Sequence, residues 1–112
     1  MVAMKRSKYR AVPTVVDNIR FASKLEARRY GELKILERAG KISGLRRQPV
    51  VVLNALGGEI VGKYVPDFCY LDEDSKQWIY EDCKGFSTPL YKFKKKCVEA
   101  QYGIKITEIR AK

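Results

Sequence analysis

Apolar residues recur along the chain with two different spacings, and the helical spacing appears in two stretches. The first stretch begins after Ser23, a good N-cap residue that Glu26 follows at the capping-box spacing. Gly40 supplies a residue type that commonly ends helices. The pattern therefore predicts a first helix over about residues 24–39.

The second helical stretch lies further along the sequence. Ser87 or Thr88 can cap it, and Pro89 fits its first turn because a proline there loses no helical hydrogen bond. Gly103 ends it. Four apolar side chains share one predicted face of this helix: Leu90, Phe93, Cys97 and Ala100.

Short runs of β-branched and aromatic residues between and after the helices predict strands. We expect strands at residues 50–53, 59–71 and 77–84, and a last strand at residues 104–109. Pro66 interrupts the second of these, which indicates an edge strand or a bulge. The predicted order is helix, three strands, helix, strand, in the α/β (α+β) class.

The composition adds a strong positive charge to this picture. The 112 residues suit one domain, and 23 Lys and Arg against 13 Asp and Glu give a net charge of +10. Such a charge on a small domain predicts a polyanionic partner, and the lack of a basic stretch with a broad apolar face favours DNA over a membrane. We expect residues 1–18 to form a flexible basic arm and residues 19–112 to form a single domain.

Outside the arm, basic residues gather in two places. Arg46 and Arg47 form a pair, and Lys92, Lys95 and Lys96 fall on one face of the second helix. We expect both groups to contact DNA phosphates. An ordinary solvated helix face is the alternative for the lysines.

Several classes of site are excluded by what the sequence lacks. With no histidine, the chain cannot form a Ser-His-Asp triad or a His-ligated zinc site. Its three cysteines form no CxxC pair, so we expect reduced thiols instead of structural zinc or disulfides. No apolar run approaches the length of a membrane helix, and the basic start lacks an apolar signal region. We therefore expect a cytoplasmic protein.

Asp67 and the segment Asp82-Cys83-Lys84 are the best candidates for chemistry. Asp82 and Lys84 point to one face of a strand, and antiparallel pairing with the preceding strand brings Asp67 alongside. Two adjacent carboxylates repel unless a cation lies between them, and Mg²⁺ prefers such oxygen ligands, with the Cys83 carbonyl as a further one. Lys84 would then orient the attacking water at a scissile phosphate. The alternative is a solvated ion pair between Asp82 and Lys84.

These residues resemble the PD-(D/E)xK motif of a nuclease superfamily, with Pro66-Asp67 separated by fourteen residues from Asp82-Cys83-Lys84. The predicted element order is similar to the core of that superfamily. Longer segments resemble a group of small phage-encoded proteins assigned to it. These segments are residues 21–30, 45–49, 80–86 and 91–96.

The resemblance implies a restriction-endonuclease-like core, with a central mixed sheet flanked by helices. It also implies that Glu26, Asp67 and Asp82 hold Mg²⁺, for which Mn²⁺ would substitute, and that Lys84 is the catalytic lysine. Gln48 would lie near this site and contact DNA. Glu26 also fits a purely structural cap with Ser23, and both interpretations stay open.

The function implied by the resemblance is that of a Mg²⁺-dependent endonuclease that hydrolyses DNA phosphodiester bonds. A domain this small has little surface for reading sequence, so we expect selection for DNA structure, such as a Holliday junction, or nicking. Symmetric cutting would require a homodimer. The alternatives are a non-catalytic DNA-binding module and an accessory subunit of a phage recombination or packaging complex. For a phage protein, the compartment would be the host cytoplasm.

Overall fold

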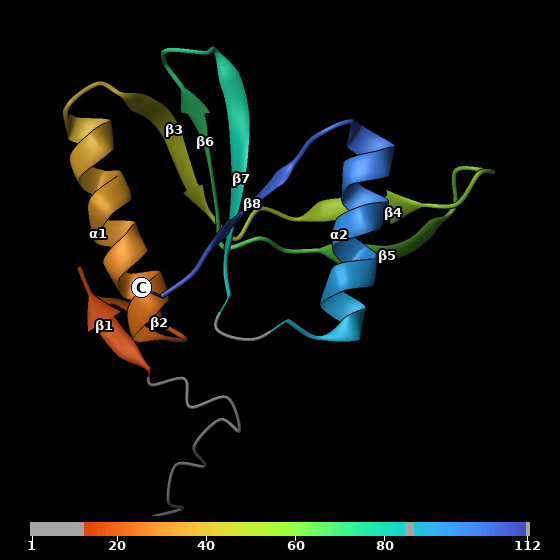
Figure 1. The fold of residues 1–112 in the computed structure, drawn as a ribbon, viewed down its shortest axis with the longest axis horizontal. Coiled ribbons are helices and arrows are strands. Elements are labelled where there is room, and N and C mark those ends of the chain that lie inside the picture. The colour runs from red at the N-terminus through yellow and green to blue at the C-terminus, as the bar shows by residue number, and fades with distance from the viewer. Residues whose placement is uncertain (1–12, 85–86, 112) are drawn as a thin grey trace, which may run out of the picture.

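A four-stranded mixed sheet forms the centre of the fold, with a helix on each side (Figure 1). The computed structural model describes residues 13–84 and 87–111. In sheet order, the strands are β3 (Ile42–Arg47), β6 (Phe68–Asp72), β7 (Gln77–Cys83) and β8 (Ile106–Ile109). Neighbours are antiparallel except β8, which runs parallel to β7. The helices are α1 (Lys24–Arg38) and α2 (Pro89–Tyr102), and the fold class is the predicted α+β.

Along the chain, the core elements follow the predicted order of helix, three strands, helix, strand, but the first strand was predicted in the wrong place. The core strand is β3, whereas residues 50–53 correspond to β4 (Val51–Asn54) in a separate two-stranded sheet. Gly44 in β3 has a φ of +64°, and the pairing register shifts between Ser43 and Arg46. This bulge breaks the alternation that marks a strand in sequence.

The single strand predicted over residues 59–71 is also wrong. It is two strands, β5 (Ile60–Tyr64) paired with β4, and β6 in the central sheet. Pro66 is fully buried between them. Because proline has no N–H for a ladder hydrogen bond, it separates the two strands and lets the chain change sheets.

The flexible arm was predicted to extend too far. Residues 14–21 form a hairpin of β1 (Thr14–Val16) and β2 (Ile19–Phe21), joined by Asp17 and Asn18 at positive φ. Two central residues at positive φ are typical of the tight turns that match strand twist. Residues 1–12, which hold the basic part of the predicted arm, lie outside the described residues.

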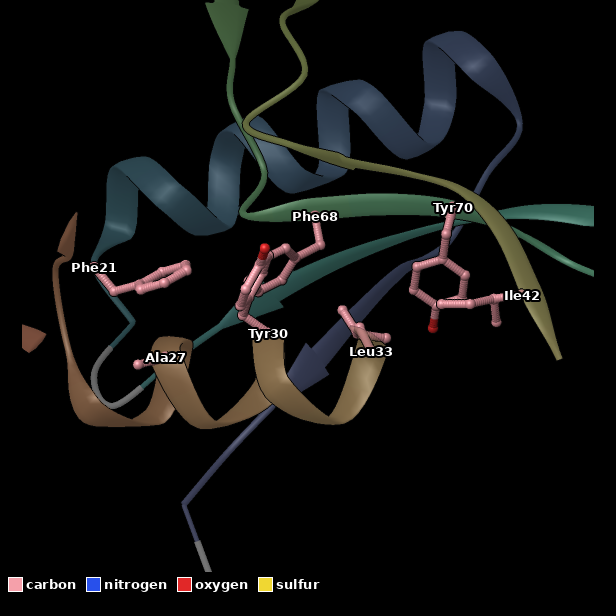
Figure 2. Packing of buried hydrophobic residues seen from close by; sticks show 7 residues of the cluster. All are labelled: Phe21, Ala27, Tyr30, Leu33, Ile42, Phe68 and Tyr70. Carbon is pink, nitrogen blue, oxygen red and sulfur yellow. The ribbon is translucent and has the colours of Figure 1, made fainter. Parts of the chain in front are cut away.

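Helix α1 has the predicted ends. The Ser23 hydroxyl accepts a hydrogen bond from the Glu26 amide at 3.1 Å, and Gly40 follows the helix at a φ of +77°. Its inner face packs on β3 and β6 in a core that Figure 2 shows from close by. The buried residues of this core are Phe21, Ala27, Tyr30, Leu33, Ile42, Phe68 and Tyr70.

Helix α2 packs with a different face from the one that the apolar pattern predicted. Thr88 caps it, and its buried residues are Tyr91 and Val98, which pack near Leu53 of β4. Leu90 and Phe93 are 62% and 65% exposed. The hairpin β4–β5, which the sequence did not reveal as a separate unit, determines which face is covered. No helix among the described residues is long and apolar enough to span a membrane.

A buried ion pair ties α1 to the central sheet. Glu81 on β7 is fully buried and accepts hydrogen bonds from Arg29 at 2.8 and 2.6 Å and from the Tyr70 hydroxyl. The other partner of Arg29 is Glu32, whose side chain is half exposed. Glu81 thus faces α1.

We expect Arg29→Met to lower the free energy of unfolding by about 3 kcal/mol, because it leaves the Glu81 carboxylate buried without its cation. Glu32→Gln removes the exposed partner of the same arginine and should cost less than about 1 kcal/mol. Urea titration followed by circular dichroism measures both. Similar losses for the two variants would contradict a dominant role for the buried pair.

Candidate metal and nucleic-acid site

The pairing of β6 with β7 brings Asp67 to Asp82, as predicted. Phe68 lies opposite Glu81, and the same register, extended by one residue, sets Asp67 opposite Asp82. The Asp67 amide donates to the Glu81 carbonyl at 3.0 Å, and the Asp67 carboxylate accepts from the Cys83 amide at 2.7 Å. Backbone bonds therefore fix Asp67 at the end of the sheet. Cys83 reaches this site through its N–H, and a ligand role for its carbonyl stays a prediction.

Asp82 lies on the face of β7 opposite Glu81 and is 3% exposed. One of its carboxylate oxygens is 3.0 Å from the Lys84 ammonium, and the other accepts a hydrogen bond from the Tyr64 hydroxyl. Strand alternation thus places Asp82 and Lys84 together, as predicted. This pair is not the solvated one that the alternative required, because the Lys84 side chain is only 21% exposed.

Lys84 is held from two further directions. Its amide donates to the Ile109 carbonyl of β8 at 2.8 Å, and its ammonium lies 3.9 Å from the centre of the Tyr91 ring. A cation over the face of an aromatic ring is attracted by the ring quadrupole. Helix α2 therefore positions this lysine through Tyr91.

Glu26 on α1 is the third carboxylate of the site. It is 6% exposed, and burial raises its pKa. The positive charges of Arg47 and Lys84 oppose this shift, and the negative charge of Asp82 adds to it. Glu26 therefore lies within electrostatic reach of the predicted site while its amide is bound by the Ser23 cap. The cap uses the backbone N–H of Glu26, so the Glu26 carboxylate is available for another role.

The three carboxylates favour a cation between them. Burial, together with the negative charges of Glu26 and Asp82, raises the pKa of Asp67 to about 7, although the hydrogen bond from the Cys83 amide opposes the shift. Hard carboxylate oxygens in such an arrangement suit Mg²⁺, whose charge would remove the repulsion. Among residues 13–84 and 87–111, no three Cys, Asp or Glu side chains are close enough together to form a preassembled metal cluster. The donor chemistry fits Mg²⁺, and closing the ligand set requires the side chains to approach one another.

Two of the predicted DNA-binding residues at the end of β3, Arg47 and Gln48, lie beside the carboxylates. The backbone N–H of Gln48 donates to the Asp67 carbonyl at 3.0 Å, so Gln48 is near the site as expected. Arg47 lies over the Phe21 ring at 4.9 Å, and its Nε is buried with no hydrogen-bond partner among the described residues. Arg46 is exposed next to it.

The three predicted lysines of α2 do not lie beside Glu26, Asp67 and Asp82. They line a hollow of about 340 Å³ that Arg110 also lines. Two carboxylates share this hollow, Glu99 and Glu108. Glu108 pairs with Lys95 at 3.4 Å and with Arg110 at 2.9 Å. Lys92 and Lys96 are exposed and are the cations best placed to meet phosphates.

Sequence reasoning missed the two tyrosines of the site. Tyr64 is buried and donates a hydrogen bond to Asp82, and burial, together with that carboxylate, raises the pKa of its hydroxyl well above its usual range. Tyr91 is buried on α2, and its ring also contacts Lys84. Tyr64 lies three residues before Asp67 on a strand of another sheet. No sequence pattern could have linked it to Asp82, because the contact depends on how that hairpin packs.

Comparison with known proteins supplies a family but no activity. Residues 6–111 match a family described as "Protein of unknown function (DUF1064)". The chain belongs to this DUF1064 family. Neither a curated protein nor a solved structure matches it. Membership of DUF1064 therefore leaves the nuclease resemblance untested, and the site itself has to support a function.

The raised pKa of Asp67 predicts a pH-dependent stability. Its pKa is about 7 in the folded chain against an ordinary value of 3.8, so the folded state holds this proton more tightly. The resulting stabilisation is complete below pH 3.8 and is lost as the pH rises to about 7. Over that window, the free energy of unfolding in EDTA should fall by up to about 1.4 kcal/mol per pH unit.

Asp67→Asn cannot ionise, so it should flatten this slope and be more stable than the wild type above pH 7. Asp74→Asn, in the exposed turn between β6 and β7, should leave the slope unchanged. Urea titrations at several pH values test both variants. An unchanged slope in Asp67→Asn would show that the shift is absent.

Proposed function

We propose that this protein is a Mg²⁺-dependent endonuclease that hydrolyses DNA phosphodiester bonds. The observation that carries the proposal is that Glu26 on α1, Asp67 just before β6 and Asp82 on β7 interact electrostatically, with the half-buried Lys84 paired to Asp82. Buried charges of one sign are costly, and carboxylates with pKa values perturbed in this way are candidates for a functional site. The resemblance to the PD-(D/E)xK motif assigns the same residues.

Each residue has a task in this proposal. Asp67 and Asp82 hold the metal, with Glu26 as a third carboxylate that binds the metal or a water. A bound Mg²⁺ would supply charge that stabilises the negative charge developing on the phosphate and would make a water more acidic. Tyr64 donates to one oxygen of Asp82 and so leaves the other toward Lys84. Tyr64 and Tyr91 are positioning residues.

Lys84 supplies the positive charge nearest to the reaction. Its ammonium has three N–H donors, one of which Asp82 engages. The remaining donors can orient the attacking water and contact a phosphate oxygen. The backbone hydrogen bond to Ile109 at the end of β8 and the Tyr91 ring limit its movement, which lowers the entropic cost of holding that geometry.

The basic residues around the site support DNA as the substrate. Arg47 and Gln48 lie beside the carboxylates, and Arg46 is exposed next to Arg47. Lys92 and Lys96 form a second positive area on α2. Such contacts read the phosphate backbone and its shape, not base sequence. A branched or nicked DNA therefore suits the proposal better than a fixed sequence, and the host cytoplasm is where a phage protein would meet it.

Cleavage of four-way-junction, supercoiled, linear and single-stranded DNA with Mg²⁺, Mn²⁺ or EDTA tests the activity. We expect metal-dependent cutting, and Asp82→Asn should reduce its rate at least about 100-fold. DNA affinity should change little, because cations supply it. Asp72→Asn, at the opposite end of β6, is the matched control and should cut normally. Tight binding without any cutting by the wild type would contradict the proposal and favour a DNA-binding module or an accessory subunit.

Lys92→Ala and Lys96→Ala together should weaken binding to all DNA substrates equally. If each lysine displaces one counterion, the double variant lowers the slope of log K against log salt by about 2. Lys76→Ala, whose lysine pairs with Glu73 in the turn after β6, should leave the slope unchanged. Fluorescence anisotropy at several salt concentrations measures the slope, and an unaltered slope in the double variant would exclude this face of α2 from the interface.

A further inference from the structure

Glu108 on β8 is a further carboxylate next to the candidate site. The parallel pairing of β7 with β8 places it opposite Asp82, on the same face of the sheet. Like charges set opposite each other on neighbouring strands are unfavourable. The side chain of Glu108 is nevertheless only 25% exposed, so its charge has to be compensated by other groups.

Three donors converge on the Glu108 carboxylate. One oxygen accepts a hydrogen bond from the Tyr91 hydroxyl at 2.8 Å and lies 3.4 Å from the Lys95 ammonium. The other oxygen lies 2.9 Å from the Arg110 guanidinium. The bond from Tyr91 is the main reason that the pKa of Glu108 lies below its usual range. Glu108 is therefore ionised at neutral pH, and hydrogen bonds to an ionised acceptor are short and strong.

Tyr91 joins this carboxylate to the candidate site. The side chain is buried, with the Lys84 ammonium 3.9 Å from the centre of its ring and the Glu108 carboxylate at its hydroxyl. The Tyr64 ring packs against it at 6.3 Å, tilted by 42°. A tyrosine ring can swing about its Cα–Cβ bond unless its far end is also held. The direction of the ring face that meets Lys84 therefore depends on Glu108.

Lys84 needs such a constraint because its ammonium is carried on a flexible four-carbon stem. The contact with Asp82 fixes one direction of the ammonium, and the Tyr91 ring fixes a second. We propose that Glu108 is a positioning residue that sets the location of the Lys84 ammonium through Tyr91. The effect on catalysis rests on the proposed nuclease function, whereas the placement of Lys84 in the free protein is independent of it.

The competing role for Glu108 is that of an ion-pair anchor for the cations of the hollow on α2. Glu99 separates the two roles, because it lines the same hollow and carries the same charge. Its carboxylate accepts from the Ile106 amide at 2.9 Å, whereas the Tyr91 hydroxyl donates to Glu108. Glu99→Gln is therefore the matched control: it removes a charge from the hollow and can still accept from that amide.

Nuclear magnetic resonance of the metal-free full chain, isotope-labelled in its lysines, measures the placement of Lys84. Protons above an aromatic ring are shifted upfield, so the ε-methylene signal of Lys84 should lie upfield of those of exposed lysines. Its loss in Lys84→Arg assigns it. Glu108→Ala should move this signal at least halfway toward the exposed position, and Glu99→Gln should leave it in place. A signal that stays in place in Glu108→Ala overturns the proposal.

Tyr91→Phe identifies the route of the effect, because it keeps the ring and removes the hydroxyl. If Glu108 acts through that hydroxyl, combining Glu108→Ala with Tyr91→Phe moves the Lys84 signal no further than either change alone. Additive shifts would show that the Glu108 charge acts on Lys84 directly, which overturns the route through Tyr91. Circular dichroism checks that each variant is folded. If Glu108→Ala is unfolded, Glu108→Gln replaces it, with a smaller shift expected in the same direction.

The cleavage assay separates positioning from anchoring. Glu108→Ala should lower kcat about tenfold, because Lys84 is displaced from its productive position. DNA binding should not weaken, since the change releases Lys95 and Arg110 to meet phosphates. An unchanged kcat with an altered KM would overturn the positioning role and assign Glu108 to the hollow. A wild type that cuts no DNA would contradict the nuclease proposal instead, and the Lys84 signal would still decide whether Glu108 positions this lysine.

Discussion

Strand β7 buries two consecutive carboxylates, one on each face of the central sheet, and the surrounding structure is arranged to satisfy both. Glu81 pairs with Arg29, and this pair links α1 to the sheet. Glu81 also accepts a hydrogen bond from Tyr70. Asp82 pairs with Lys84, which contacts Tyr91 of α2, and accepts a hydrogen bond from Tyr64 of the hairpin β4–β5. Because side chains alternate along a strand, one ionic contact serves stability and the adjacent one is available for chemistry. The charges of a single strand are therefore linked to both helices and to the hairpin.

The features that sequence predicted well are those governed by local rules. The caps at Ser23 and Thr88 depend on a few neighbouring residues, and both helices begin where these residues indicate. The opposition of Asp67 and Asp82 follows from a short turn and strand alternation, so it could also be foreseen. Electrostatic contact of Glu26 with the same site was expected only through the family resemblance, because no local pattern links a helix residue to a distant strand.

The features that escaped prediction depend on packing between segments far apart in sequence. The bulge at Gly44 hid β3, and the continuous apolar run over residues 59–71 concealed a change of sheet. The apolar spacing on α2 was real, but the hairpin decides which of its faces is covered. Tyr64 joins the candidate site for the same reason. Periodicity reports which residues are apolar, and it does not report which neighbour will cover them.

The hairpin β4–β5 leaves and rejoins the central sheet at a single point, since Arg47, the last residue of β3, is paired directly with Phe68, the first of β6. Residues 48–67 are thus an excursion whose two ends lie side by side, and a tight turn would serve the sheet equally well. The exposed tip around Leu56 can lengthen or shorten while the rest of the domain keeps its shape, whereas Leu53 and Tyr64 are fixed in the core with α2. Because the excursion carries Asp67 and Tyr64 at its returning end, this freedom is limited to its outer part. The tip can diverge, whereas the last few residues are constrained by the site they enter.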